Sequence, residues 1–241
     1  MTHLFTNDAV ARHVAEMLRQ ESFALLDIGC SGGIHPAWRV FDERLRAVGF
    51  DPNIEEVERL RAKESLPGVS YEAAFVGVPD QHPLALDLGG RPFVQRTPWA
   101  RLSVARTLAI REEFLKQADN QALTSMNAWP RTRLAPREPI FLPDYIASHQ
   151  FDDIDFVKID IDGGDFIVLQ SLFESPAGSK ILGLMLEVNF HGTDDPRDNT
   201  FHNTDRFMRR MGFELFDLSV RYYSSASLPL HYEYDMPAQT L

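Results

Sequence analysis

Ionisable side chains that could move a proton or hold a metal ion gather in the second half of the chain, beside two short apolar segments. They are Lys158, Asp160 and Asp162 near the first segment, and Glu187 and His191 near the second. The segments cover residues 156–159 and 181–188, and their apolar residues predict two β-strands. Carboxylates that lie close together repel one another when ionised, so their convergence favours proton uptake or metal binding.

A glycine-rich turn near the start of the chain predicts a nucleotide site. Residues 23–26 predict a buried strand, residues 36–45 predict a helix, and the pattern D-x-G-x-x-x-G lies between them at 27–33. Glycines in such a turn let the backbone approach a ligand closely. The dinucleotide-binding pattern G-x-G-x-x-G needs a glycine where this chain has Ser31, so that pattern fails. Cys30 is better explained as a small apolar filler than as a nucleophile, because no motif sets a base beside it.

A second acidic residue supports this site. Asp51 closes a predicted strand at residues 47–51 and is followed by Pro52. It lies about 20 residues beyond the glycine turn, where α/β nucleotide-binding folds carry a carboxylate that accepts hydrogen bonds from ribose hydroxyls. Dehydrogenases share this feature, so it does not distinguish between cofactors.

Strands and helices are predicted to alternate along the chain, which favours an α/β fold with a doubly wound, Rossmann-like sheet. Strands are expected at residues 23–26, 47–51, 69–76, 156–159, 181–188, 213–216 and 220–223, and helices at 9–19, 36–45, 54–63 and 166–172. The expected sheet has seven strands and is mostly parallel, with an antiparallel strand at its C-terminal end. We expect residues 1–241 to form one domain.

Residues 77–149 are predicted to be an insertion or cap, because an ordinary connection in such a sheet needs far fewer residues. A hairpin near 84–88 and a helix at 103–116 are expected within it. The segment is rich in arginine and contains Trp99 and Trp129. It could be a lid that meets an anionic or sugar-like ligand. A solvated arginine surface and the arm of a homodimer are the alternatives.

The composition excludes some classes of function. The net charge of −11 argues against binding of nucleic acid or a membrane surface by the protein as a whole. No apolar run approaches the roughly 18 residues of a membrane-spanning helix, and the first residues lack the layout of a signal peptide. A single cysteine cannot form a disulfide within the chain, so a reducing, cytoplasmic location is expected.

Two motifs resemble those of a known family. Residues 27–33 resemble motif I of class I S-adenosylmethionine (SAM) methyltransferases, and residues 155–169 resemble D-x-x-K-I-D-V-E-G-x-E-x-x-V-L, the hallmark of FkbM-type methyltransferases. Residues 141–146, 187–188 and 211–216 are similar to further segments of that family. The resemblance implies a SAM-dependent O-methyltransferase that acts on a hydroxyl of a sugar, a glycan or a natural product.

The resemblance also implies which residues hold SAM. They are Asp27, Gly29, Cys30, Ser31, Gly33, Asp51, Pro52, Ala74 and Asp160. A neutral hydroxyl needs a base or a metal ion to take its proton, and Asp160 is the first candidate base. Lys158 or His191 would help it, and Glu187 would orient the acceptor. A divalent metal ion held by Asp160, Asp162 and Glu187 is the less favoured alternative.

Three positions depart from the family pattern. Asp162 and Asp165 stand where the family has glutamate, so each carboxylate reaches one methylene less far. Ser31 stands where the family usually has asparagine. These differences bear on the fine geometry of the site.

Two other functions fit the same elements. An NAD-dependent oxidoreductase would use a similar sheet, although the failed G-x-G-x-x-G pattern argues against it. A non-catalytic subunit that binds SAM or another nucleotide would use the insertion as an interaction arm.

Overall fold

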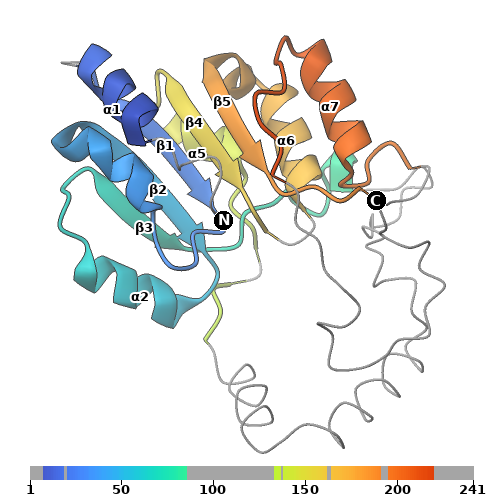
Figure 1. The fold of residues 1–241 in the computed structure, drawn as a ribbon. Coiled ribbons are helices and arrows are strands. Elements are labelled where there is room, and N and C mark those ends of the chain that lie inside the picture. The colour runs from blue at the N-terminus through green and yellow to red at the C-terminus, as the bar shows by residue number, and fades with distance from the viewer. Residues whose placement is uncertain are drawn as a thin grey trace, which may run out of the picture.

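Five parallel strands form a sheet in the computed structural model, which describes residues 8–18, 21–85, 133–136, 138–161, 164–190 and 195–219 (Figure 1). The strands are β1 (Phe23–Ile28), β2 (Leu45–Asp51), β3 (Val69–Ala73), β4 (Ile154–Ile159) and β5 (Ile181–Leu186). Their spatial order is β3-β2-β1-β4-β5, which is Rossmann-like. The prediction of an α/β fold with a doubly wound parallel sheet is confirmed.

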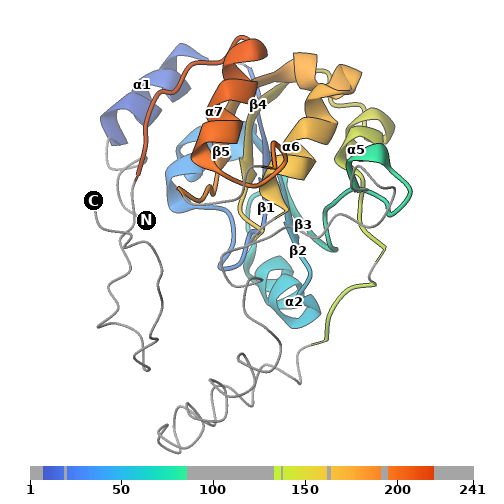
Figure 2. The same ribbon diagram turned by 90° about the vertical axis from the view of Figure 1, so that its right-hand side faces the viewer.

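Helices cover both faces of this sheet (Figures 1 and 2). One face carries α1 (Asp8–Met17), the 3₁₀ helix η1 (Pro36–Arg44) and α2 (Ile54–Lys63). The other carries α5 (Leu142–Ser148), α6 (Asp165–Phe173) and α7 (Phe201–Arg210). The short 3₁₀ helices η2 (Pro83–Ala85) and η5 (Pro176–Lys180) complete the helical elements of the described residues. None of these helices is long and apolar enough to cross a membrane.

The central strand β1 shows why this sequence forms a two-faced sheet. All six of its residues are buried, as expected for a parallel strand covered by helices on both sides. Leu25 belongs to the apolar cluster under α2 and η1, whereas Leu26 and Ile28 belong to the cluster under α5 and α6. Successive side chains of a strand point to opposite faces, so one apolar run supplies both cores.

The structure corrects the predicted C-terminal strand at 213–216. Gly212, at φ +89°, and Phe213 instead form the cap that ends α7: the Gly212 amide donates to Arg209 O and the Phe213 amide to Met208 O. Phe216 is 96% exposed, and residues 213–219 contain no strand. The expected partner strand at 220–223 lies outside the described residues, so the described sheet has five strands, all parallel, in place of seven.

Smaller corrections concern the ends of elements. The predicted helix at 36–45 is a 3₁₀ helix interrupted by Asp42, at φ +50°, and β2 already begins at Leu45. The third strand ends at Ala73, three residues earlier than predicted. A polar, turn-rich boundary gives a weaker periodic signal than the middle of an element, which explains these shifts.

The start of the predicted insertion at 77–149 lies beside Ile140, just ahead of α5. Ile140 donates its amide to Phe75 O over 2.8 Å and accepts a hydrogen bond from the Gly77 amide over 3.1 Å. The segment after β3 and the segment before α5 therefore run together at this point. The division into one domain with an insertion stays a prediction. Residues 86–132, with the expected helix at 103–116, lie outside the described residues. Residues 83–85 of the segment around the expected hairpin form η2.

Candidate functional site

Most of the predicted site residues that the structure describes lie at one edge of the sheet, where its parallel strands end. Asp27 on β1 pairs in register with Lys158 on β4. Just beyond that pair, the Asp160 amide donates to Ile28 O over 3.0 Å, and the Glu187 amide donates to Ile159 O over 3.1 Å. Because the strand order reverses between β1 and β4, this edge includes the switch point at which ligands bind in open α/β sheets.

The glycine turn after β1 folds against the end of β4. Gly29 has φ +82°, and a Cβ atom built there would lie 1.9 Å from the carbonyl oxygen of Asp160. The amides of Gly29 and Cys30 both donate to Phe50 O on β2, over 2.9 and 3.0 Å. Only glycine combines this left-handed backbone with so close an approach, so the turn needs Gly29 for its shape.

Gly32, at the tip of the same turn, faces open space. It has φ +87°, and an added Cβ atom would meet no heavy atom within 4 Å. Ser31 beside it is exposed. A ligand can therefore approach the backbone of the turn here, which is the space that a nucleotide cofactor would need.

Lys158 on β4 contacts both the sheet and the glycine turn. Its Nζ lies 3.0 Å from Asp27 Oδ1 and donates to Gly29 O over 2.9 Å. Asp27 is 2% exposed and Lys158 9% exposed. Burial raises the pKa of the Asp27 carboxyl group, and the Lys158 ammonium group acts in the opposite direction. Lys158 is therefore one half of a buried ion pair and not a free amine.

Asp160 is the more accessible carboxylate of this group. Its Oδ2 lies 3.6 Å from Lys158 Nζ, and 29% of its side chain is exposed, against 3% for Asp27. Glu187, next to it at the end of β5, is exposed. Of the two carboxylates beside Lys158, Asp160 is therefore the one that a dissolved acceptor could reach.

Asp51 and its neighbours form the β2 side of the site. Asp51 Oδ1 accepts the Asn53 amide over 2.8 Å, and its carbonyl oxygen accepts the Ala74 amide over 3.1 Å. Burial raises the pKa of the Asp51 carboxyl group, and the hydrogen bond from Asn53 acts against this. Pro52 O accepts the Ala135 amide over 2.8 Å, so the segment that returns from the predicted insertion lies against the end of β2.

Cys30 is turned into the protein. Its side chain is buried, and a Cβ atom added at Gly49 would lie 2.7 Å from its sulfur. Burial raises the pKa of the Cys30 thiol. The side chain therefore fills space under the turn, and a ligand would meet at most the backbone of this residue. Gly33 stands nearby at φ +91°, with its amide donating to Cys30 O over 2.7 Å.

One carboxylate at this site was missed by sequence reasoning. Glu56, in the first turn of α2, accepts the amide of Gly32 over 3.0 Å. Asn53, three residues earlier, caps α2 by accepting the Glu56 amide. The spacing of Asn53 and Glu56 matches a helix-capping pattern, which was the available signal. The pattern gives no indication that the Glu56 side chain turns toward the glycine loop instead.

Two predicted site residues fall outside the part of the chain that the structure describes. Asp162 and His191 lie outside the described residues, so the structure does not test their roles. Among the residues that are described, no group of three His, Cys, Asp or Glu side chains could hold a metal ion. The proposed metal set includes Asp162 and therefore stays a prediction.

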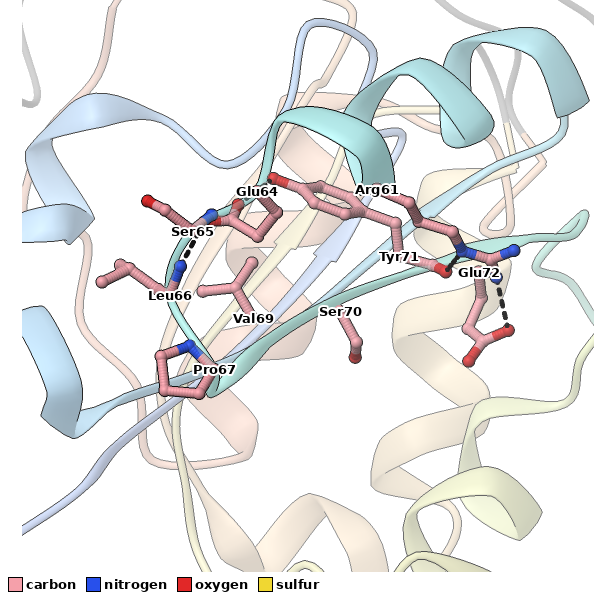
Figure 3. A pocket seen from close by; sticks show the side chains of 9 residues that line it. All are labelled: Arg61, Glu64, Ser65, Leu66, Pro67, Val69, Ser70, Tyr71 and Glu72. Atoms are coloured by element: carbon pink, nitrogen blue, oxygen red, sulfur yellow. Dashed lines mark hydrogen bonds and ion pairs between the residues drawn. The ribbon is translucent and has the colours of Figure 1, made fainter.

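An open depression of about 380 Å³ lies elsewhere, along the edge strand β3. Figure 3 shows Arg61 of α2 at one end of it, facing Glu72, with the ion pair at 3.5 Å. Glu64 on its other side accepts hydrogen bonds from Tyr71 Oη and from both terminal nitrogens of Arg39. No predicted site residue lines this depression, and its charged groups are engaged with one another, so we assign it no role in the chemistry.

Comparison with known families finds a match in the second half of the chain. Residues 129–215 match the family model of the Methyltransferase FkbM domain. The matched segment contains α5, β4, α6, β5 and α7, and with them Lys158, Asp160 and Glu187. No curated protein and no solved structure matches the chain.

Proposed function

We propose that this chain is a SAM-dependent methyltransferase that methylates a hydroxyl group of a sugar, a glycan or a natural product, because residues 129–215 match the model of the Methyltransferase FkbM domain. The observation that supports this most is the position of Asp160. Its backbone lies against the glycine turn, its side chain is partly exposed, and Glu187 lies next to it. A proton acceptor thus stands beside the loop that would carry the methyl donor.

The residues around the turn fit SAM as a cofactor. The exposed tip at Ser31 and Gly32 leaves room for the ligand, and Gly29 and Gly33 set the path of the backbone. Asp51 and Pro52 at the end of β2, with Ala74 beyond β3, form the side on which ribose and adenine would lie. SAM supplies an activated methyl group, and the protein contributes alignment and removal of a proton.

Asp160 would take the proton of the acceptor hydroxyl. Lys158 Nζ lies 3.6 Å from Asp160 Oδ2, so a positive charge stands beside the candidate base. Lys158 itself is engaged by Asp27 and Gly29, so it helps as a fixed positive charge. Glu187 would accept a hydrogen bond from a second hydroxyl of the acceptor and so orient it.

Other features of the proposal rest on the sequence alone. His191 remains a second candidate helper, and Asp160, Asp162 and Glu187 remain the candidate ligands of a divalent metal ion. The arginine-rich segment supports an anionic acceptor, and it could equally form the contact of a homodimer. The single cysteine supports a cytoplasmic location.

Two measurements test the function. Calorimetry with SAM and with S-adenosylhomocysteine should show binding of both by the wild-type protein. Labelled SAM, incubated with a panel of glycans, nucleotide sugars and natural products, should then transfer its methyl group to at least one of them. Absence of binding by folded protein would refute the proposal, and NAD binding under the same conditions would support an oxidoreductase. Binding without transfer to any acceptor would favour the non-catalytic subunit.

The base is tested by Asp160→Asn. We expect turnover to fall by about 10² to 10⁴-fold, the usual contribution of a general base, while binding of S-adenosylhomocysteine stays within a few-fold of wild type. Asp153→Asn, an exposed change just before β4, is the matched control and should leave turnover unchanged. Equal turnover for Asp160→Asn and wild type would remove Asp160 as the base.

A further inference from the structure

Asp165, the first residue of α6, is fully buried although it carries a carboxyl group. Its Oδ1 accepts the backbone amide of Ile161 over 3.0 Å, and its Oδ2 accepts Asn199 Nδ2 over 3.3 Å. The N-terminus of a helix favours a negative charge, which helps to hold the carboxylate there. Asp165 therefore connects the exit of β4, the start of α6 and the segment that leads into α7.

Asn199 extends this connection to β5. It is 3% exposed, and the same Nδ2 that contacts Asp165 donates to Glu187 O over 3.0 Å. Its own carbonyl oxygen accepts the Asn189 amide over 3.1 Å, and Thr200 beside it caps α7 by accepting the Asn203 amide. The backbone of Asn199 is thus fixed by the hydrogen bond from Asn189. A shift of Asn199 would disturb Thr200 and the start of α7.

These contacts fix the backbone on both sides of the candidate base. The Asp160 amide is held by Ile28 O, and the next amide, that of Ile161, is held by Asp165. The backbone of Glu187 is held in the same way. Its amide donates to Ile159 O, and its carbonyl oxygen accepts a hydrogen bond from Asn199 Nδ2. The hydrogen bonds of Asp165 and Asn199 thus connect the backbone segments that carry the Asp160 and Glu187 carboxylates.

We propose that Asp165 and Asn199 are positioning residues that set the spacing of Asp160 and Glu187 for methyl transfer, an inference that rests on the function proposed above. Neither of them is a catalytic residue, because both act through the backbone of the groups they hold. Displacement of a reacting group by about 1 Å can cost about 10²-fold in rate. The pair would therefore affect turnover without contacting the acceptor.

The test uses Asp165→Asn, Asn199→Asp and the double variant that exchanges the two side chains. Asp165→Asn brings two amide groups face to face, and Asn199→Asp brings two carboxylates face to face. The exchanged pair can again form a hydrogen bond and can still accept the Ile161 amide, but it has lost the donor to Glu187 O. Asp205→Asn, a similar change farther along α7, is the control.

Three quantities are measured: hydrogen exchange at the Ile161 amide, affinity for S-adenosylhomocysteine by calorimetry, and transfer from labelled SAM to the acceptor that wild type uses. We expect each single variant to exchange Ile161 at least tenfold faster and to lose about 10²-fold in kcat, with the affinity for S-adenosylhomocysteine changed by less than about threefold. The exchanged pair should restore protection of Ile161 but only part of kcat. Asp205→Asn should match wild type in all three.

The failure of this inference can be told from the failure of the proposed function. A wild-type protein that neither binds S-adenosylhomocysteine nor transfers methyl groups contradicts the proposed function. Hydrogen exchange at Ile161 in the variants still shows whether Asp165 and Asn199 fix the backbone after β4. An active wild type with single variants of unchanged kcat contradicts the positioning role. So does a loss of kcat without faster exchange at Ile161, or a double variant that is no better than the single ones.

Discussion

Lys158 and Asp27 lie on neighbouring strands with Lys158 Nζ 3.0 Å from Asp27 Oδ1, and both side chains are almost entirely buried. The same ammonium group holds the carbonyl oxygen of Gly29. An ion pair inside the protein thus fixes the loop that would bind the cofactor. We therefore expect the shape of the glycine turn to depend on this ion pair.

Removal of Lys158 should destabilise the protein strongly. In Lys158→Met the Asp27 carboxylate stays buried without its cation, and such a change costs about 3–5 kcal/mol of unfolding free energy. Urea denaturation followed by circular dichroism measures it. The double variant Asp27→Leu, Lys158→Met should recover most of this loss, because an apolar pair often replaces a buried ion pair without cost. Binding of S-adenosylhomocysteine should not recover, since Gly29 O has lost its donor. A double variant that binds like wild type would contradict this account.

Gly29 and Gly32, both in the turn after β1, provide a matched pair of substitutions. In Gly29→Ala the new Cβ atom would lie 1.9 Å from Asp160 O, so the turn and the end of β4 must separate, and binding of S-adenosylhomocysteine should be lost. In Gly32→Ala no atom lies within 4 Å of the new Cβ, and only the left-handed backbone is strained, at about 1–2 kcal/mol. Calorimetry on both purified variants makes the comparison. Similar affinities for the two would show that the contact with Asp160 O does not shape the site.

Asp51→Asn should separate stability from binding. Burial raises the pKa of the Asp51 carboxyl group, so the charged form is disfavoured in the fold, and a neutral amide can still accept the Asn53 amide. The free energy of unfolding should therefore stay the same or rise. Affinity for S-adenosylhomocysteine should fall by about tenfold or more, because hydrogen bonds to a charged group contribute about 1.5–3 kcal/mol. Glu72→Gln, at the end of the neighbouring strand β3, is the control and should bind normally.

Glu64 should make the fold sensitive to acid. Hydrogen bonds from Arg39 and Tyr71 and from nearby amides lower the pKa of Glu64 to about 2, against an ordinary value of 4.5. A carboxyl group with a lowered pKa contributes stability above its unfolded value and loses it as the pH falls toward its folded value. The difference in unfolding free energy between wild type and Glu64→Gln should therefore shrink between about pH 5 and pH 2. Urea denaturation over this range measures the difference. Asp27 and Asp51, whose pKa values are raised by burial, are present in both proteins, so their contributions to the pH dependence cancel. A difference that does not change with pH would mean that Arg39 does not hold the ionised form.

The sequence was sufficient for the chemistry at the ends of the strands. The apolar run of β1, the glycine turn after it and the acidic residues at or just after the ends of β2, β4 and β5 are local patterns. In a parallel sheet with a switch point, such patterns bring Asp27, Asp51 and Asp160 to one edge, and the structure has them there. Helix α2 was predicted with its observed bounds for the same reason, because its apolar spacing is continuous.

Partners that are distant in the chain were decided only by the tertiary structure. Lys158 and Asp27 are 131 positions apart, and whether Lys158 is a free amine or half of an ion pair depends on the pairing of β1 with β4. Asp165 and Asn199 are 34 positions apart, and no periodic pattern connects them. Phe213 shows that a local pattern can also mislead over a short distance. The residues around it are typical of a strand, but its amide donates to Met208 O in the cap that ends α7. Local side-chain patterns determine which element can form, whereas sheet order and register determine which groups meet, and the site of this protein depends on both.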